Sequence, residues 1–376
     1  MNKENINRVI IAASEMDSDL FYATHFLAPD AFLFVSIQGK KFLVMSDLEI
    51  DRAKSQASVD EVLSLSEYAK RAREKKPGIC LYAEIAALIL EEHQQKQVYV
   101  PQTFPVLYAD YLRKRGIDLV IGEDPFYIER LIKSDEEIVA IRESLKHTED
   151  SMGMAIEMIK AAKVVNGRLE RNGKSLTSED VRTAIHLFLM ERDMVGQHTI
   201  VAGGEQCVDP HNVGSGPLYA NQTIIFDIFP RSSHSRYFAD MSRTVVKGKA
   251  SDAVKKMYDT VHEGMNFAFN QAKDGASGKK IHMDICQYFE SKGFKTGIEN
   301  GRMQGFFHST GHGVGLDIHE LPRISQSDYI LKKNHVVTVE PGLYYQGIGG
   351  IRIEDMILIR ENDNELLTQY PKVLEV

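Results

Sequence analysis

Cysteine is scarce in this chain, which contains Cys80, Cys207 and Cys286 among its 376 residues. The three cysteines are far apart, odd in number and form no CxxC motif, so we expect neither a disulfide framework nor a thiolate zinc site. Scarce and unpaired cysteine is typical of proteins from a reducing compartment. We therefore expect a cytoplasmic protein.

Long apolar runs and an excess of positive charge are also missing. No apolar stretch is long enough to cross a bilayer, and residues 1–14 make a poor signal peptide because their apolar run is short and soon followed by acidic residues. The net charge of -8 argues against nucleic acid as the main partner, since phosphate binding needs a clustered basic surface. We expect no membrane and no nucleic acid as partner.

The length suggests two domains, and residues 1–128 have the pattern of an α/β domain. Short apolar runs alternate there with helical patterns. The expected elements are a strand at 8–13, a hairpin around Gly39 within 31–46, a helix at 83–96, a strand at 97–101, a helix at 104–116 and a strand at 117–122. No glycine-rich loop follows a strand here, so the pattern does not favour a nucleotide-binding fold.

Residues 129–376 contain a layout that occurs twice. Ser134 and Glu137 form a capping-box pattern before a helix with an apolar stripe, and a second helix is capped at Thr177. Strands at 222–230 and 237–248 follow, and the second half repeats this order with strands at 335–345 and 349–360. Each strand carries one acidic residue of a set of four: Asp227, Asp240, Glu340 and Glu354. If the duplication holds, these carboxylates surround a pseudo-two-fold axis.

Taken singly, the four acidic residues have ordinary explanations. An aspartate at a strand end is most often a turn former or a cap, and Glu354 beside Arg352 and Asp355 would form a solvated ion pair. As a group they need another explanation, because Asp227 and Glu340 share strand faces with apolar residues and should be buried. Buried carboxylates without partners take up protons, and metal cations are the simplest partners that keep four of them ionised.

Histidines near these acids point in the same direction. The segment at 306–322 contains His308, His312 and His319 among several glycines. The glycines argue against a helical HxxxH pair and predict a close approach of the backbone to a crowded site. The segment is a poor phosphate loop, since neither a lysine nor a helix start follows it. Four carboxylates and one imidazole suit two divalent metals that share a bridging water, which is chemistry for amide hydrolysis.

These motifs resemble the metallopeptidases with the "pita-bread" fold, namely aminopeptidase P, prolidase and methionine aminopeptidase. The matching segments are "YFADMSRT", "HSTGHGVGLDIHE", "TVEPGLYY" and "GIRIEDMILI", in the order typical of the family. The resemblance runs from about residue 130 to the end. Residues 1–128, with "FYATHFLAPDAFLFV", are similar to the domain that precedes the catalytic domain in aminopeptidase P, prolidase and creatinase. The resemblance therefore implies an α+β protein with an α/β domain at 1–128 and a pita-bread catalytic domain at 129–376.

The resemblance also implies a set of metal ligands. Asp227 would bind one metal, Asp240 and Glu354 would bridge both, and His312 and Glu340 would bind the second. Glu340 would also accept a proton from the bridging water. Manganese is favoured because most ligands are oxygens, with cobalt, zinc or iron as alternatives.

Four further residues receive roles from the same resemblance. His308 and His319 would flank the substrate and stabilise the tetrahedral intermediate, and His211 in "VDPHNVGSG" would lie near the substrate unless it belongs to a plain turn. Arg352 would orient the site or form a structural ion pair. Two departures stand out: Phe229 replaces a glycine usual in the family, and the loop from Asp227 to Asp240 is about two residues longer.

The resemblance implies a dinuclear metal-dependent exopeptidase that cuts between an N-terminal residue and a following proline, and a homodimer. It leaves Xaa-Pro dipeptidase and Xaa-Pro aminopeptidase open. The alternatives are a methionine aminopeptidase-like enzyme, which the N-terminal domain disfavours, and a non-enzymatic binding protein with the same fold. A di-metal oxidase-like protein is disfavoured because the predicted helices contain no Glu-x-x-His motif.

Overall fold

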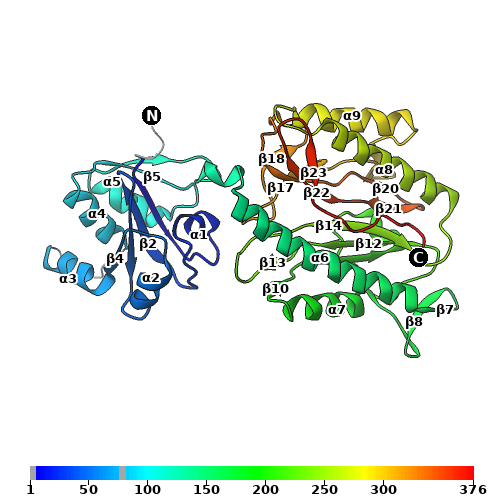
Figure 1. Cartoon of the computed structure of the whole chain (residues 1–376), viewed down its shortest axis with the longest axis horizontal. Helices are drawn as coiled ribbons and strands as arrows, with labels where there is room; N and C mark the ends of the chain where they lie inside the picture. Colours follow the sequence, from blue (N-terminus) through cyan, green and yellow to red (C-terminus); the bar gives the residue numbers. More distant parts are fainter. Residues whose placement is uncertain (1–5, 76–81) are drawn as a thin grey trace. The chain divides into compact units, whose positions relative to one another are not determined.

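The computed structural model describes residues 6–75 and 82–376 (Figure 1). The chain divides into two compact units, Met1–Arg130 and Leu131–Val376. Across the described residues, every helix is too short or too polar to span a bilayer. Cys207 and Cys286 carry free thiols, and Cys80 lies outside the described residues.

A six-stranded mixed sheet forms the centre of the first unit, in the order β4-β3-β2-β1-β5-β6. Its strands are β1 (Arg8–Ala12), β2 (Phe32–Ile37), β3 (Lys40–Met45), β4 (Glu61–Ser64), β5 (Gln97–Val100) and β6 (Asp118–Ile121). Strand β2 pairs antiparallel with β1 and β3, whereas the other three pairs are parallel. Gly39 has a φ of 84° in the turn between β2 and β3. The predicted hairpin and the other predicted strands of this unit are confirmed.

Helices of the first unit accompany this sheet. They are α1 (Ser18–Thr24), α2 (Ile50–Gln56), α3 (Leu65–Lys75), α4 (Tyr82–Glu92) and α5 (Val106–Lys114), followed by a short 3₁₀ helix, η2 (Ile128–Leu131). The sequence predicts α4 and α5, and both are confirmed. It does not single out the first three, because α1 and α2 have seven residues each and α3 carries few apolar residues.

The second unit contains four longer helices. They are α6 (Asp135–Ala161), α7 (Ser178–Met190), α8 (Asp252–Gln271) and α9 (Gly278–Ser291). Ser134 and Glu137 form the predicted capping box, with the Ser134 N–H donating to Glu137 Oε2 at 2.7 Å and the Glu137 N–H donating to Ser134 Oγ at 3.2 Å. Thr177 caps α7 in the same way with Asp180. Both helix starts were therefore predictable from local sequence.

Strands of the first half of this unit build a three-stranded sheet in the order β11-β12-β14. The strands of this half are β7 (Lys163–Val165), β8 (Arg168–Arg171), β9 (Lys174–Ser175), β10 (Met194–Val195), β11 (Ile200–Gly203), β12 (Thr223–Ile228), β13 (Arg231–Ser232) and β14 (Met241–Val246), with a 3₁₀ helix η3 (Gly204–Val208). One hydrophobic core joins β12 and β14 to α6 and α7. These two helices therefore pack on one face of the sheet and leave its other face to the site (Figure 1).

Strands of the second half form a five-stranded sheet in the order β18-β17-β19-β22-β23 and a separate pair, β20-β21. The strands are β15 (Gly297–Glu299), β16 (Arg302–Gln304), β17 (Gly311–Gly313), β18 (Glu320–Ile324), β19 (Val336–Val339), β20 (Gly342–Tyr345), β21 (Gly349–Arg352), β22 (Asp355–Ile359) and β23 (Asn364–Leu366). A second core joins these strands to α8 and α9. The predicted order of two helices followed by strands thus occurs in both halves (Figure 1).

Three of the four acidic residues do not lie inside strands, contrary to the prediction. Asp227 lies within β12, but β14 begins one residue after Asp240. The two later predicted strands each divide in two, with Glu340 between β19 and β20 and Glu354 between β21 and β22. Pro341 has no N–H to continue a ladder, and β19 pairs with β22 whereas β20 pairs with β21. The chain therefore changes sheet at these carboxylates.

Candidate metal centre

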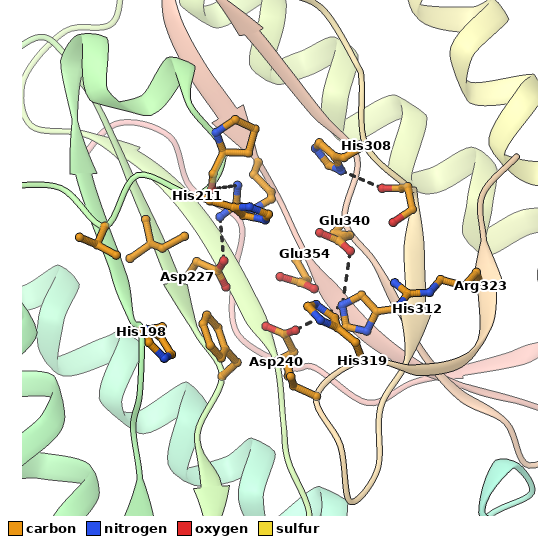
Figure 2. A pocket seen from close by; sticks show the side chains of 17 residues that line it. His198, His211, Asp227, Asp240, His308, His312, His319, Arg323, Glu340 and Glu354 are labelled. Carbon is orange, nitrogen blue, oxygen red and sulfur yellow. Dashed lines mark hydrogen bonds and ion pairs between the residues drawn. The ribbon is translucent and has the colours of Figure 1, made fainter. Parts of the chain in front are cut away.

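One cavity of about 560 Å³ in the second unit brings the predicted site residues together (Figure 2). All nine of them line it: His211, Asp227, Asp240, His308, His312, His319, Glu340, Arg352 and Glu354. These residues come from strands β12 and β21, from the glycine-rich segment, from the breaks beside strands and, for His211, from the turn after η3. Their convergence follows from the fold, but their chemical roles remain predictions.

Strand β12 shows how the fold aims a carboxylate at the cavity. Ile224, Phe226 and Ile228 pack into the core beneath α6 and α7. Side chains alternate along a strand, so Asp227 points to the opposite face. This is the face that the cavity occupies, and Phe229 lines it one residue beyond the strand.

Three residues form the tightest cluster in the cavity. Asp240, His312 and Glu354 are buried, and each offers a ligand atom within 4.8 Å of the others. His312 Nε2 lies 3.6 Å from Asp240 Oδ2 and 3.4 Å from Glu340 Oε1. Its Nδ1 is 3.0 Å from the carbonyl oxygen of Gly313 and donates to it, which leaves Nε2 as the nitrogen available to a metal. Burial lowers the pKa of His312 to about 3, so the imidazole is neutral.

Unpartnered oxygens test whether metal ions fit this cluster. Asp227 Oδ1, Asp240 Oδ1 and Glu354 Oε1 are buried and have no hydrogen-bond partner within the described chain. Such oxygens are costly unless a cation or donor meets them. The donor set of carboxylates and one neutral imidazole suits divalent first-row cations, so the residues fit the metals that the sequence predicts.

Burial and mutual repulsion raise the pKa of the clustered carboxyl groups. The pKa of Asp240 lies well above its usual range, because of burial first and then the charges of Glu354 and Asp227. The pKa of Glu354 is also well above its usual range, because of burial first and then the charge of Glu340. Burial also raises the pKa of Glu340 from 4.5 to about 8, although Arg352 opposes it. The chain itself therefore does not supply enough positive charge to keep the whole cluster ionised.

Arg352 is the chain's own cation at this site. Its Nη2 donates to Asp227 Oδ2 at 2.7 Å, and its Nε donates to Ser242 Oγ at 3.0 Å. Its Nη1 donates to the carbonyl oxygen of Pro210, next to His211, and to the hydroxyl of Tyr344, both at 3.1 Å. Arg352 therefore forms a buried ion pair with Asp227 and also contacts Pro210 and Tyr344, whereas its role in the site stays a prediction.

Two polar residues behind the carboxylates escaped the sequence analysis as site residues. Ser242 Oγ donates to Glu354 Oε2 at 2.7 Å, which leaves Oε1 as the unpartnered oxygen. The Tyr344 hydroxyl lies 3.0 Å from His308 Nε2. Ser242 could have been found from register, since it follows Asp240 by two residues and pairs with Asp227 across β12 and β14, whereas the contact of Tyr344 with His308 joins residues distant in sequence.

The remaining histidines differ in how much of the imidazole is free. His308 Nδ1 is 2.8 Å from the carbonyl oxygen of Ser309 and donates to it, so Nε2 accepts from Tyr344. Burial lowers the pKa of His308 to about 3. His319 is exposed, and its ring stands at 90° to that of His312 with centroids 4.4 Å apart. His211 is exposed at the edge of the cavity, and its N–H donates to Asp209 Oδ1 at 3.2 Å, so the turn and the site position coexist.

The glycine-rich segment packs closely against neighbouring backbone on either side of His312. A Cβ on Gly311 would lie 1.9 Å from the carbonyl oxygen of Thr338, and one on Gly313 would lie 2.3 Å from that of Leu321. Part of this segment forms β17, so the histidine pair is not helical. Glycine is therefore needed here to let β17 pack against its neighbours.

The long loop between Asp227 and Asp240 folds into a hairpin. Its residues Arg231–Ser232 form β13, which pairs antiparallel with β10. The Ser232 N–H donates to the carbonyl oxygen of Tyr237 at 3.1 Å, and Arg236 closes the turn with a φ of 68°. The loop therefore contributes one strand to the two-stranded sheet β10-β13.

Two further side chains in the cavity were not predicted. His198 and Arg323 line it on opposite sides of the carboxylates (Figure 2). Arg323 lies four residues after His319, and its guanidinium forms no ion pair or hydrogen bond with the described residues. A basic residue four positions after a site histidine was the available signal for Arg323. His198 lies far from the motifs in sequence and gave no signal.

These features define a candidate dinuclear metal centre in a cavity open to a small substrate. Residues 139–361 match metallopeptidase family M24. The chain therefore belongs to this family, as the sequence motifs predicted.

Relatives and solved structures extend the match over the whole chain. The chain is 28% identical over 382 residues to an Xaa-Pro dipeptidase of Pyrococcus horikoshii, covering 100% of this chain and 96% of that protein. It is similar in structure to an Xaa-Pro dipeptidase from Bacillus anthracis, with a TM-score of 0.82, 24% identity and coverage of 98% and 95%. An X-Pro aminopeptidase from Thermotoga maritima gives a TM-score of 0.81, 22% identity and coverage of 99% and 98%. The α+β fold, with an N-terminal α/β domain and a pita-bread catalytic domain, is thus confirmed.

Proposed function

We propose that this protein is a dinuclear metal-dependent exopeptidase that hydrolyses the bond between an N-terminal residue and a following proline. The observation that carries the proposal is the cluster of Asp240, His312 and Glu354 in an open cavity. Unpartnered buried oxygens on Asp227, Asp240 and Glu354 support it. Residues 1–128 would precede a catalytic domain at 129–376 in a cytoplasmic homodimer.

The residues of the cavity would have two roles in hydrolysis, metal binding and proton transfer. Asp227, Asp240, His312, Glu340 and Glu354 would hold two divalent ions, with manganese favoured by the oxygen-rich donors. Such a pair of ions supplies an activated water and polarises the scissile carbonyl. Glu340 is the nearest carboxylate to His312 Nε2, at 3.4 Å, and would take the proton of the attacking water.

The histidines would bind the substrate on either side of the carboxylates. His319 is exposed beside His312 and would donate to the oxygen of the tetrahedral intermediate. His308 would do so only after Tyr344 releases its Nε2. His211, held next to the Arg352–Pro210 contact, would meet the substrate at the edge of the cavity.

Arg323 favours a dipeptide among the Xaa-Pro substrates. Its guanidinium lines the cavity without a carboxylate partner among the described residues. In an Xaa-Pro dipeptide the C-terminal carboxylate follows the scissile bond by a single residue, so one guanidinium near the metals can meet it. A longer peptide places its carboxylate farther away. We therefore propose a dipeptidase, as the name of the Pyrococcus relative suggests.

A metal-dependent assay tests the proposed function. Purified protein should bind up to two divalent ions and hydrolyse Ala-Pro, with manganese, cobalt and zinc compared. Chelation should abolish turnover, and Asp240→Asn or Glu354→Gln should lower it by about a thousandfold or more while the protein still folds. Activity that survives chelation would refute the mechanism.

The same assay separates the alternatives. Ala-Pro should be cut faster than Ala-Pro-Ala and Ala-Pro amide, and Arg323→Met should reduce this preference. Hydrolysis of Met-initiated peptides alone would favour a methionine aminopeptidase-like enzyme. Bound metal with no turnover on any peptide would favour a non-enzymatic binding protein.

A further inference from the structure

A second, smaller cavity of about 130 Å³ lies beside the metal cavity. Three residues line both spaces: His198, Phe229 and Ile318. Phe238 lines only the smaller cavity. Phe229 and its two neighbours therefore stand between the two spaces.

The backbone fixes Phe229 in this position. It follows the last residue of β12, and alternation places it on the cavity face two residues after Asp227. The next residue, Pro230, accepts a hydrogen bond from the Ala239 N–H at 3.2 Å, and Arg231 pairs with Val195 between β13 and β10. These contacts of Pro230 and Arg231 therefore hold Phe229 at the base of the hairpin.

The direction of the substrate follows from the two sides of the cavity. Arg323 and His198 lie on opposite sides of the carboxylates (Figure 2). A C-terminal carboxylate at Arg323 and a scissile bond at the carboxylates place the N-terminal residue toward His198. Phe229 shares both cavities with His198, and Ile200 and Ile318 add apolar surface to the metal cavity. The N-terminal side chain therefore meets an apolar wall in which Phe229 is the largest residue.

We propose that Phe229 determines which N-terminal residue the enzyme accepts. Its ring closes the metal cavity against the smaller one and restricts the first residue to small and medium aliphatic side chains. Removal of the ring joins the two spaces and admits an aromatic side chain. The inference rests on the proposed function, since it assumes that an Xaa-Pro dipeptide lies in the cavity.

Substitution of Phe229 tests this inference with a matched control. Wild-type protein and the variants Phe229→Gly, Phe229→Ala and Phe238→Ala are assayed with manganese on Ala-Pro, Leu-Pro and Phe-Pro. We expect the ratio of kcat/KM for Phe-Pro to that for Ala-Pro to rise about tenfold or more in both Phe229 variants. Phe238→Ala enlarges the smaller cavity without opening it to the metals, so this ratio should stay within about twofold of wild type.

The outcomes distinguish the two proposals. If the Phe229 variants fold, bind metal and cut Ala-Pro with an unchanged ratio, the specificity role is refuted and the proposed function stands. The same holds if Phe238→Ala shifts the ratio as strongly. Thermal denaturation and metal content identify a variant that does not fold, and Phe229→Ala retains a Cβ in case the glycine variant fails. If the wild-type protein cuts no Xaa-Pro dipeptide, the proposed function fails and the inference falls with it.

Discussion

Replacing Ser242 by alanine removes one hydroxyl from behind the metal cluster. Ser242 Oγ donates to Glu354 Oε2 at 2.7 Å, accepts from Arg352 Nε at 3.0 Å and is fully buried. A hydrogen bond to a charged group contributes about 1.5–3 kcal/mol. An outer-shell partner of this kind typically changes metal affinity by about 10–100-fold, which agrees with that range. We therefore expect Ser242→Ala to bind manganese about 10–100-fold more weakly.

Calorimetric titration of the metal-free protein with manganese measures this change. Thr244→Val is the matched control, because Thr244 lies two residues farther along β14 and is equally buried. The Thr244 hydroxyl donates to the carbonyl oxygen of Arg352 at 2.9 Å and accepts from the backbone N–H of Arg352 at 3.0 Å. It has no hydrogen bond to a carboxylate within the described chain. Wild-type affinity in Ser242→Ala, or an equal loss in Thr244→Val, would refute the reasoning.

Two further predictions concern the metal-free protein and a buried ion pair. Without metal, stability should fall as pH rises from about 4.5 to about 8, because folded Glu340 keeps its proton up to a pKa of about 8 whereas the unfolded chain releases it near 4.5. Urea unfolding with a chelator measures this slope, and a flat profile would contradict it. Lys133→Met should lower the free energy of unfolding by about 3–5 kcal/mol, because Lys133 Nζ lies 2.8 Å from Glu320 Oε2 and both side chains are at most 3% exposed. Denaturant titration tests this, and a loss below about 1 kcal/mol would count against it.

The sequence predicted those parts of the fold and site that local patterns encode. The capping boxes at Ser134 and Thr177 each depend on residues three positions apart, so they were visible without the fold. Alternation along the predicted strand placed Asp227 on a face shared with apolar residues, and in the structure this is the face opposite the helix core. The glycines at 311 and 313 predicted close backbone approach, which the structure confirms. The motif resemblance then pointed to the other predicted site residues, but not to His198 or Arg323.

Features that depend on contacts distant in sequence could not be predicted. The breaks at Glu340 and Glu354 arise because each chain segment leaves one sheet for another. The hydrogen bond of Tyr344 to His308 joins residues 36 positions apart. His198 reaches the cavity from a different part of the chain than the motifs. The hydrophobic period and the spacing of motifs contain no information on such contacts, because tertiary packing determines them.

Two pairs of adjacent residues, Glu354 with Asp355 and Ser242 with Arg243, show how the two buried carboxylates differ in their partners. Glu354 and Asp355 are adjacent and buried. Asp355 is neutralised within the chain, by Arg243 Nη2 at 2.7 Å and by Lys372 Nζ at 2.5 Å. Ser242, the residue before Arg243, donates its neutral hydroxyl to Glu354 Oε2.

The same two backbone segments thus bring the permanent cation of Arg243 to Asp355 and only the neutral hydroxyl of Ser242 to Glu354. The amino-acid sequence supplies fixed positive charge to Asp355, so a buried carboxylate at this depth can be neutralised by the chain alone. At Glu354 the fold leaves Oε1 without a partner among the described residues, next to Asp240 and His312. Burial of a charge is tolerated where a counter-charge meets it. The contrast is therefore best explained if the cavity side is built for an exchangeable cation, whose loss should affect Glu354 and leave Asp355 unchanged.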